Sequence, residues 1–110
     1  MPAHFNIDKS ANGQFHFNLT AGNGEKILSS EMYNAKDAAQ NGIASVQANC
    51  GDDVRYEKKD SSAGQPYFNL KAANHQVIGS SQMYVSTSSR DSGIAAVKAG
   101  GSTKDIRDNC

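Results

Sequence analysis

An internal repeat constrains this sequence more than any other feature. The segment QFHFNL at residues 14–19 aligns with QPYFNL at residues 65–70, an offset of 51, and the same offset continues without gaps to the end of each copy. Roughly 40% of the aligned positions are identical. The chain therefore consists of two copies of one unit, residues 5–49 and 56–100, followed by a C-terminal segment, residues 101–110.

Each copy has the pattern of three strands. Apolar and polar residues alternate over residues 5–9 and 15–19, and Asn12-Gly13 separates them, which predicts a hairpin with one polar face. Asn23-Gly24 predicts a second, two-residue turn with positive φ at both positions, before a third strand over residues 26–29. In the second copy His75 replaces the turn glycine, and Pro66 should mark the first residue of a strand or an edge, because it cannot donate to a ladder.

A helix follows the strands in each copy. After Tyr33 the apolar residues recur at helical spacing, among them Ala39, Gly42 and Val46, and the second copy repeats this stripe. Asn34 is the predicted N-cap of the first helix and Ser86 that of the second. A glycine at the middle of both helices indicates a close approach to the sheet or to the other helix.

The chain is long enough for one domain, and we predict that residues 1–110 form it. Its 110 residues with 37% hydrophobic content supply one modest core, and a single unit would leave one face uncovered. We therefore predict an α+β fold with one mostly antiparallel sheet of six or more strands, both helices on one face and a pseudo-twofold axis. Because the second copy takes the place of a partner subunit, we expect a monomer, although a free edge strand would favour association.

The repeated motifs resemble a known family. Phe-Asn-Leu-x-Ala-x-Asn, followed by Ile-x-Ser-Ser-x-Met-Tyr and Gly-Ile-x-x-Val, resembles the YegP-like family of small uncharacterised bacterial proteins, and both copies match over nearly their whole length. The resemblance implies tandem β-β-β-α-β units that join in one sheet by exchanging their last strands. By that analogy residues 52–56 and 104–107 would supply exchanged strands. The family brings no activity, ligand or catalytic residue.

Motifs for common chemistry are absent from the sequence. It contains no Cys-x-x-Cys, His-Glu-x-x-His, phosphate-binding loop or Gly-x-Ser-x-Gly, and no histidine pair is repeated between the copies. We therefore predict no catalytic residue, no metal ligand and no cofactor. A small enzyme with one degenerate repeat stays an alternative, and it would place a deep pocket in only one copy.

Charge and targeting signals are equally neutral. The eleven basic and eleven acidic residues cancel, the N-terminus lacks a secretory pattern, and no apolar stretch approaches the roughly 20 residues that span a bilayer. We expect a cytoplasmic protein without a membrane partner, with Cys50 and Cys110 as free thiols.

Polar residues repeated in both copies are the candidate binding residues. They are Asn18 with Asn69, Ser30 with Ser81 and Tyr33 with Tyr84, next to the repeated Ser29 and Ser80. One interpretation is that they satisfy backbone groups near the strand-to-helix connection. The other is that they line two pseudo-symmetric pockets or one groove at the repeat junction. Met32 and Met83, beside the tyrosines, are predicted to pack in the core.

The sequence alone supports a small non-catalytic module that binds a protein, a peptide or a small metabolite through the open sheet face or the repeat junction. A single-stranded nucleic-acid binder is the alternative, because Arg55, Lys58, Lys59 and Lys71 could gather near aromatic residues. Interleaved acidic residues would largely cancel that positive field, so nucleic acid is not the expected partner.

Overall fold

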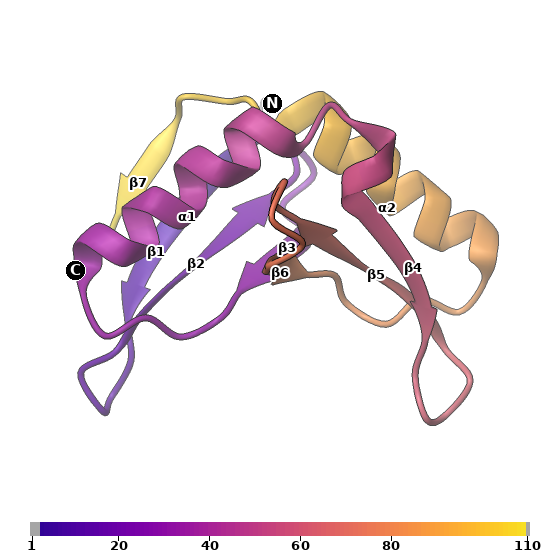
Figure 1. Cartoon of the computed structure of the whole chain (residues 1–110), viewed down its shortest axis with the longest axis horizontal. Helices are drawn as coiled ribbons and strands as arrows, with labels where there is room; N and C mark the ends of the chain where they lie inside the picture. The colour runs from indigo at the N-terminus through magenta and orange to yellow at the C-terminus, as the bar shows by residue number, and fades with distance from the viewer. Residues whose placement is uncertain (1–2, 110) are drawn as a thin grey trace.

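The computed structural model describes residues 3–109, so Cys110 lies outside the described residues. The elements follow in the order β1 (His4–Lys9), β2 (Phe15–Thr20), β3 (Lys26–Ser30), α1 (Lys36–Asn49), the short 3-10 helix η1 (Asp53–Arg55), β4 (Tyr56–Asp60), β5 (Pro66–Lys71), β6 (Val77–Ser80), α2 (Thr87–Gly100) and β7 (Ile106–Asp108). The predicted order of three strands and a helix thus occurs twice (Figure 1). No helix in this part of the chain is long and apolar enough to cross a membrane.

All seven strands belong to one sheet, in the order β4-β5-β6-β3-β2-β1-β7. Neighbouring strands are antiparallel except β1 and β7, which run parallel. The two repeats meet where β3 pairs with β6, and Ser29 lies opposite Ser80 at this junction. The order reads the same outward from the junction through three strands on each side, and β7 is the one addition. The predicted α+β fold with a single, mostly antiparallel sheet is confirmed.

The hairpin loops differ in detail from the prediction. The loop after β2 is closed by a hydrogen bond from Gly24 N–H to the Ala21 carbonyl oxygen (2.9 Å), and Gly24 has φ +87°. Asn23 does not have a positive φ, so the predicted two-residue turn is wrong and the loop has three residues. At the equivalent position His75 adopts φ +69°, which a non-glycine residue enters at some cost.

Helix α1 begins one residue later than predicted, whereas α2 begins where it was predicted. Ala35, which has extended backbone and no side-chain cap, precedes α1, so the prediction of Asn34 as N-cap is wrong. Asn34 Oδ1 instead accepts a hydrogen bond from Gln14 Nε2 (3.0 Å). The cap of α2 is confirmed, because Ser86 Oγ accepts from Ser89 N–H (3.1 Å). The offset of 51 aligns Ser86 with Ala35 and would have placed both caps.

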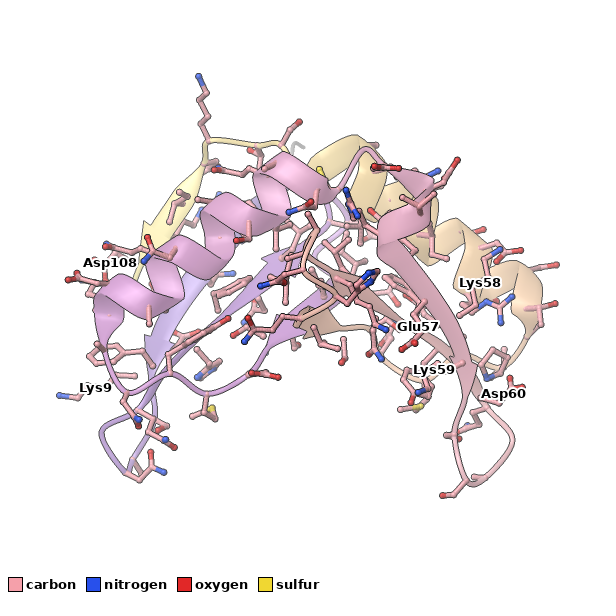
Figure 2. All side chains as sticks on the ribbon, viewed as in Figure 1. Lys9, Glu57, Lys58, Lys59, Asp60 and Asp108 are labelled. Carbon is pink, nitrogen blue, oxygen red and sulfur yellow. The ribbon has the colours of Figure 1, made fainter. Side chains whose placement is uncertain are left out.

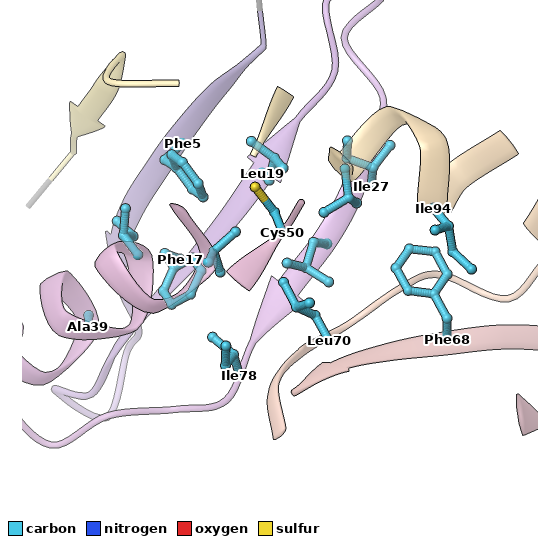
Figure 3. Close-up of a cluster of buried hydrophobic side chains, with 14 of the residues drawn as sticks. Phe5, Phe17, Leu19, Ile27, Ala39, Cys50, Phe68, Leu70, Ile78 and Ile94 are labelled. Carbon is cyan, nitrogen blue, oxygen red and sulfur yellow. The ribbon is translucent and has the colours of Figure 1, made fainter. Parts of the chain in front are cut away.

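One hydrophobic core spans both repeats. Side chains of β1, β2, β3 and α1 form a single cluster with those of β5, β6 and α2, and they include Phe5, Phe17, Leu70 and Ile94 (Figure 3). Burying a phenylalanine side chain contributes about 1.5–3 kcal/mol, so contacts across the junction contribute substantially to stability. Neither repeat encloses this interior without the other.

A pseudo-equivalent aromatic stack joins sheet and helix in each repeat. Phe17 packs edge-on against Phe5 (6.1 Å between centroids) and lies parallel to Tyr33 (6.3 Å). Phe68 repeats these contacts with Tyr56 and Tyr84. Each stack lies against the mid-helix glycine of its own repeat, as the sequence pattern indicated.

β7 is an exchanged strand. It leaves the second repeat and pairs with β1 of the first, where Phe5 N–H donates to the Asp105 carbonyl and Asn109 N–H donates to the Ile7 carbonyl (both 2.9 Å). The strand expected at residues 104–107 lies at Ile106–Asp108 in the structure. The expectation for residues 52–56 is wrong, because they form η1 and the start of β4. The chain continues from α1 directly into the second repeat, so the same residues cannot also form an exchanged strand.

Candidate functional site

A row of polar residues crosses the sheet on the face opposite the helices. Strand pairing places one residue of each strand in the row, in the order Glu57, Asn69, Ser80, Ser29, Asn18, Asn6 and Arg107. The predicted candidates Asn18 and Asn69 lie symmetrically within it. The structure thus brings the repeated asparagines and the first serine of each pair into one line across all seven strands.

Hydrogen bonds within the sheet satisfy much of this row. Asn18 Oδ1 accepts from Asn6 Nδ2 (3.3 Å), and Asn69 Oδ1 accepts from Ser80 Oγ (2.6 Å). Both asparagines are buried, with 4% and 9% of their surface exposed. Such amides cost stability when they are left without partners, so their internal bonds favour a structural role.

The repeat-2 end of the row is charged. Glu57 accepts hydrogen bonds from Lys71 Nζ (2.8 Å) and from Asn69 Nδ2 (3.3 Å). Both hydrogen bonds lower the pKa of the Glu57 carboxyl, and the bond from Lys71 has the larger effect. The carboxylate of Glu57 is therefore already neutralised within its own face of the sheet.

Ser30 and Ser81 occupy a different place. Each hydroxyl accepts from a backbone N–H of the neighbouring strand, Ser30 from Phe17 (2.8 Å) and Ser81 from Phe68 (3.0 Å), and donates to the carbonyl that follows it. Both serines therefore satisfy ladder donors where β3 and β6 end. Their role in ligand binding stays a prediction.

Tyr33 and Tyr84 line two pseudo-equivalent pockets of about 220 and 590 Å³. Each pocket lies between the tyrosine and helix of one repeat and the second hairpin loop of the other. Burial raises the pKa of both phenols. At Tyr84 the nearby Gln82 side chain lowers the pKa and so offsets part of this rise. Tyr84 Oη has no hydrogen-bond partner within residues 3–109.

Met32 and Met83 are exposed to 44% and 47%, so the prediction that they pack in the core is wrong. They follow the end of β3 and β6, where the chain has left the sheet and the helix has not yet begun. Met83 lines the larger of the two tyrosine pockets. Both methionines are exposed because they lie beyond the end of a strand, and the hydrophobic periodicity of the sequence did not locate that end.

Helix α1 reinforces the exchanged strand at the outer edge of β1. Gln47 Nε2 donates to the Thr103 carbonyl (2.8 Å) before β7 begins, and Lys36 forms an ion pair with Asp108 at its end. The edge of β1 is therefore closed by backbone pairing and by two side chains of the overlying helix.

The pseudo-equivalent edge of β4 is open. Tyr56, the counterpart of Phe5, donates its N–H to the Asp53 carbonyl of η1, so this group points away from β5. Lys58, the counterpart of Ile7, is two residues further along and therefore directs its N–H and C=O the same way. Within residues 3–109, no strand pairs with this side of β4 (Figure 1).

A groove of about 460 Å³ lies between this edge and α2, and we call it the β4–α2 groove. Its lining residues include Asp53, Tyr56, Lys58, Asp91, Ile94 and Lys98. Lys58 lies on the α2 side of β4, while Glu57 and Lys59 lie on the other side (Figure 2). The groove occupies the place beside β4 and α2 that β7 fills beside β1 and α1.

Ion pairs hold the charges around the groove. Lys98 pairs with Asp53, and Lys58 Nζ lies 3.5 Å from Asp91 Oδ1. Arg90 Nε lies 3.4 Å from the same oxygen, so two cations share one carboxylate. The basic residues on β4 and β5 that the sequence analysis considered for nucleic-acid binding are likewise paired with acidic neighbours, for example Lys71 with Glu57.

Sequence reasoning missed this groove, although the repeat offset held a signal for it. Residues 55–57 align with residues 4–6, where β1 lies, and also with residues 106–108, which form β7. One stretch of chain thus stands where two strands are needed. Two outer edges and a single terminal strand follow directly from that count.

No group of three or more His, Cys, Asp or Glu side chains in the described part could hold a metal ion.

The fold and these sites define a class of protein: a tandem-repeat α+β protein with one pseudo-twofold sheet and an exchanged terminal strand. The profile of DUF1508, a domain of unknown function, matches residues 10–57 and 61–108, again 51 apart. The chain belongs to this family, the YegP-like UPF0339 proteins.

Relatives and solved structures agree with this assignment. The chain is 56% identical to UPF0339 protein YegP of Escherichia coli K12 over 109 residues, which cover 99% of each chain. A solution NMR structure of Escherichia coli yegP, a protein of unknown function, matches with a TM-score of 0.94 and 56% identity, covering 99% of this chain and 94% of that one. UPF0339 protein SO3888 of Shewanella oneidensis matches with a TM-score of 0.93 and 54% identity, covering 98% and 92%.

Proposed function

We propose that this protein is a non-catalytic binding module that takes an extended peptide segment of a partner protein as an added strand along the outer edge of β4. One observation carries the proposal: in the part of the chain that the structure describes, the edge of β1 is closed by a parallel strand and the pseudo-equivalent edge of β4 is not. An exposed edge is a template for pairing with another chain, and peptide recognition by strand addition uses such edges.

The groove supplies the side-chain contacts that strand addition needs. Gln47 of α1 donates to a carbonyl beside β7, and Lys98 stands at the equivalent position of α2. Asp53, which now pairs with Lys98, is 80% exposed, so this ion pair contributes little and its opening costs little. An incoming carbonyl oxygen can then take the place of the Asp53 carboxylate.

The repeat junction is the weaker candidate. Asn18 and Asn69 already have partners within the sheet, and Ser30 and Ser81 satisfy backbone donors. A ligand there would have to replace these bonds, whereas the outward backbone groups of Lys58 are available to a strand.

A cytoplasmic location suits the buried free thiol of Cys50, because thiols stay reduced there.

Strand addition is tested with a peptide of residues 103–109, acetylated and amidated, added to the ¹⁵N-labelled full chain. We expect amide shift changes along β4 and on the facing side of α2, and their loss in the Lys58→Pro variant. Proline is tolerated on an edge strand whose N–H faces solvent, so this variant should fold. Lys59→Ala, which changes only the opposite face, is the matched control.

A control on the peptide does not depend on the fold of the variant. N-methylation at the residue equivalent to Asn109 should abolish binding, because that N–H faces the neighbouring strand, while N-methylation at the residue equivalent to Asp108 should not. Shift changes confined to β1, or equal binding of both methylated peptides, would overturn the proposal.

A further inference from the structure

We infer that the β4–α2 groove selects a peptide with an apolar residue opposite Tyr56 and an acidic residue two positions later, opposite Lys58. This inference rests on the proposed function, and it adds the chemical class of the peptide. It concerns two side-chain positions that face α2, and it follows from register, lining and charge in turn.

The register comes from the strand already in place. In the β1–β7 pair, Phe5 lies opposite Ile106 and Ile7 lies opposite Asp108. The offset of 51 carries these two positions of β1 to Tyr56 and Lys58 of β4. A strand parallel to β4 in the same register therefore presents one side chain beside Tyr56 and the next on that face beside Lys58, because alternate residues share a face.

The first position is apolar. Its surroundings in the groove are the Tyr56 ring and the side chains of Ile94 and Ala95 on α2. Lys98 Nζ lies 6.0 Å from the centroid of the Tyr56 ring, so its alkyl stem covers part of this surface. An apolar side chain at this position would remove part of this surface from water, and the equivalent position beside β1 is occupied by Ile106, which is itself 43% exposed.

The second position is acidic. Beside β1 the cation that meets Asp108 is Lys36 of α1, and its counterpart on α2 is the neutral Thr87. In the groove the cation comes from β4 itself, because Lys58 replaces Ile7. Lys58 and Arg90 share the single carboxylate of Asp91, so an added acidic side chain balances the charge and an added basic one leaves three cations to one anion.

The position between these two carries no selectivity. It lies beside Glu57 on the opposite face, and Glu57 is already bound to Lys71 and Asn69. Either charge at this peptide position would meet a group whose charge is largely compensated. Arg107, which occupies this position in the peptide of residues 103–109, is therefore expected to have little effect on binding.

The test compares three peptides with the full chain by NMR titration. The first is the peptide of residues 103–109, the second carries Asp108→Lys and the third carries Ile106→Ser. We expect the first to bind about two- to fivefold more tightly than either of the others, as a cross-strand pair of this kind contributes. The preference for the acidic peptide should shrink at roughly 1 M salt, because part of the site is exposed.

A triple variant inverts every charge around this position and keeps an internal ion pair. In Lys58→Glu with Arg90→Glu and Asp91→Lys, two anions share one cation, and we expect the Asp108→Lys peptide to become the tighter ligand. Circular dichroism and the unchanged shifts of repeat 1 would show that this variant folds. If it does not fold, Lys58→Gln serves instead, and it should bind the first two peptides equally.

The outcomes separate the two proposals. If all three peptides bind β4 with the same affinity, or the triple variant keeps the original preference, selectivity is overturned and strand addition stands. If no peptide shifts the β4 amides at millimolar concentration, strand addition fails and the selectivity fails with it. If the chain instead dimerises with increasing concentration through the β4 edge, the occupant of this edge is a second copy and the inferred partner is wrong.

Discussion

At the scale of single residues, the mid-helix glycines explain how closely each helix approaches the sheet. A Cβ at Gly42 would lie 2.6 Å from Phe17 Cε2 and 2.8 Å from Tyr33 Oη, and a Cβ at Gly93 would lie 2.7 Å from Tyr84 Cζ. The sequence predicted a close approach from the repeated glycine. It could not name the partner, because the stacking of tyrosine on phenylalanine depends on the sheet.

Gly42→Ala should therefore destabilise the protein although alanine favours helix. Alanine gains about 1 kcal/mol in helix propensity, but overpacking against the buried Phe17 ring costs about 1–3 kcal/mol, and we expect a net loss. Chemical denaturation measures this change. Gly51→Ala, where nothing lies within 4 Å of the new Cβ, is the control and should be near neutral. A Gly42→Ala variant more stable than the parent would contradict the contact.

Ser81→Ala and Ser29→Ala should differ in cost. Ser81 Oγ accepts from the buried Phe68 N–H, so its loss leaves that donor unsatisfied at about 1–3 kcal/mol. Ser29 is exposed, and its replacement should stay within about 0.5 kcal/mol. The free energies of unfolding of the two variants test this directly. Equal values would remove the structural role given to the second serine of the pair.

At the scale of elements, the strands and helices followed from the sequence, while their ends did not. Alternation predicted β1 and β2, and helical spacing predicted α1, because burial of one face determines both patterns. The hairpin type and the cap at Asn34 were wrong, because several local geometries fit the same residues there. Pro66 begins β5 as predicted. The Pro66 carbonyl still accepts a hydrogen bond from Tyr84 N–H. At the equivalent place in the first repeat, Phe15 and Tyr33 exchange two backbone hydrogen bonds.

Removal of β7 should expose the edge of β1. A chain ending at residue 102 loses the parallel pair with β1 and the Lys36–Asp108 ion pair, so we expect a lower denaturation midpoint. With both outer edges open, we also expect association that increases with concentration. Denaturation and sedimentation velocity of the truncated and full chains test this. Equal stability with a monomer at every concentration would show that β7 contributes little to closing the sheet.

At the scale of the whole molecule, burial of phenols ties stability to alkaline pH. Desolvation raises the pKa of Tyr33, Tyr56 and Tyr84 in the folded state, and Tyr56 Oη also donates to the Cys50 carbonyl (2.6 Å). A raised pKa stabilises the fold fully below the unfolded value of about 10, and this contribution is lost as pH rises through the folded pKa.

The free energy of unfolding should therefore fall above about pH 10. Denaturant titrations between pH 8 and pH 11, followed by tyrosinate absorbance, measure the fall. A Tyr56→Phe variant is less stable at neutral pH because it loses the hydrogen bond to Cys50, but its stability should depend less on alkaline pH. A flat profile in the parent would contradict the burial of these phenols.

The twofold architecture was predictable from the repeat, and the shared core followed from the small apolar content of each copy. The alternating pattern placed Asn18 and Asn69 on the polar face of their strands, but their internal bonding depends on strand register. The open edge of β4 was not found, because it arises from what the chain lacks. Two copies of a first strand share one terminal strand, and only the assembled sheet shows which copy receives it.

Amide hydrogen exchange tests the unequal edges most directly. Ile7 lies between β2 and β7, while its counterpart Lys58 has, among residues 3–109, a neighbouring strand only on the β5 side. We expect the Lys58 amide to exchange more than about tenfold faster than the Ile7 amide in the full chain, since only one of them is enclosed by pairing. Equal protection of the two amides would mean that something already closes the β4 edge, and the binding role proposed for it would be wrong.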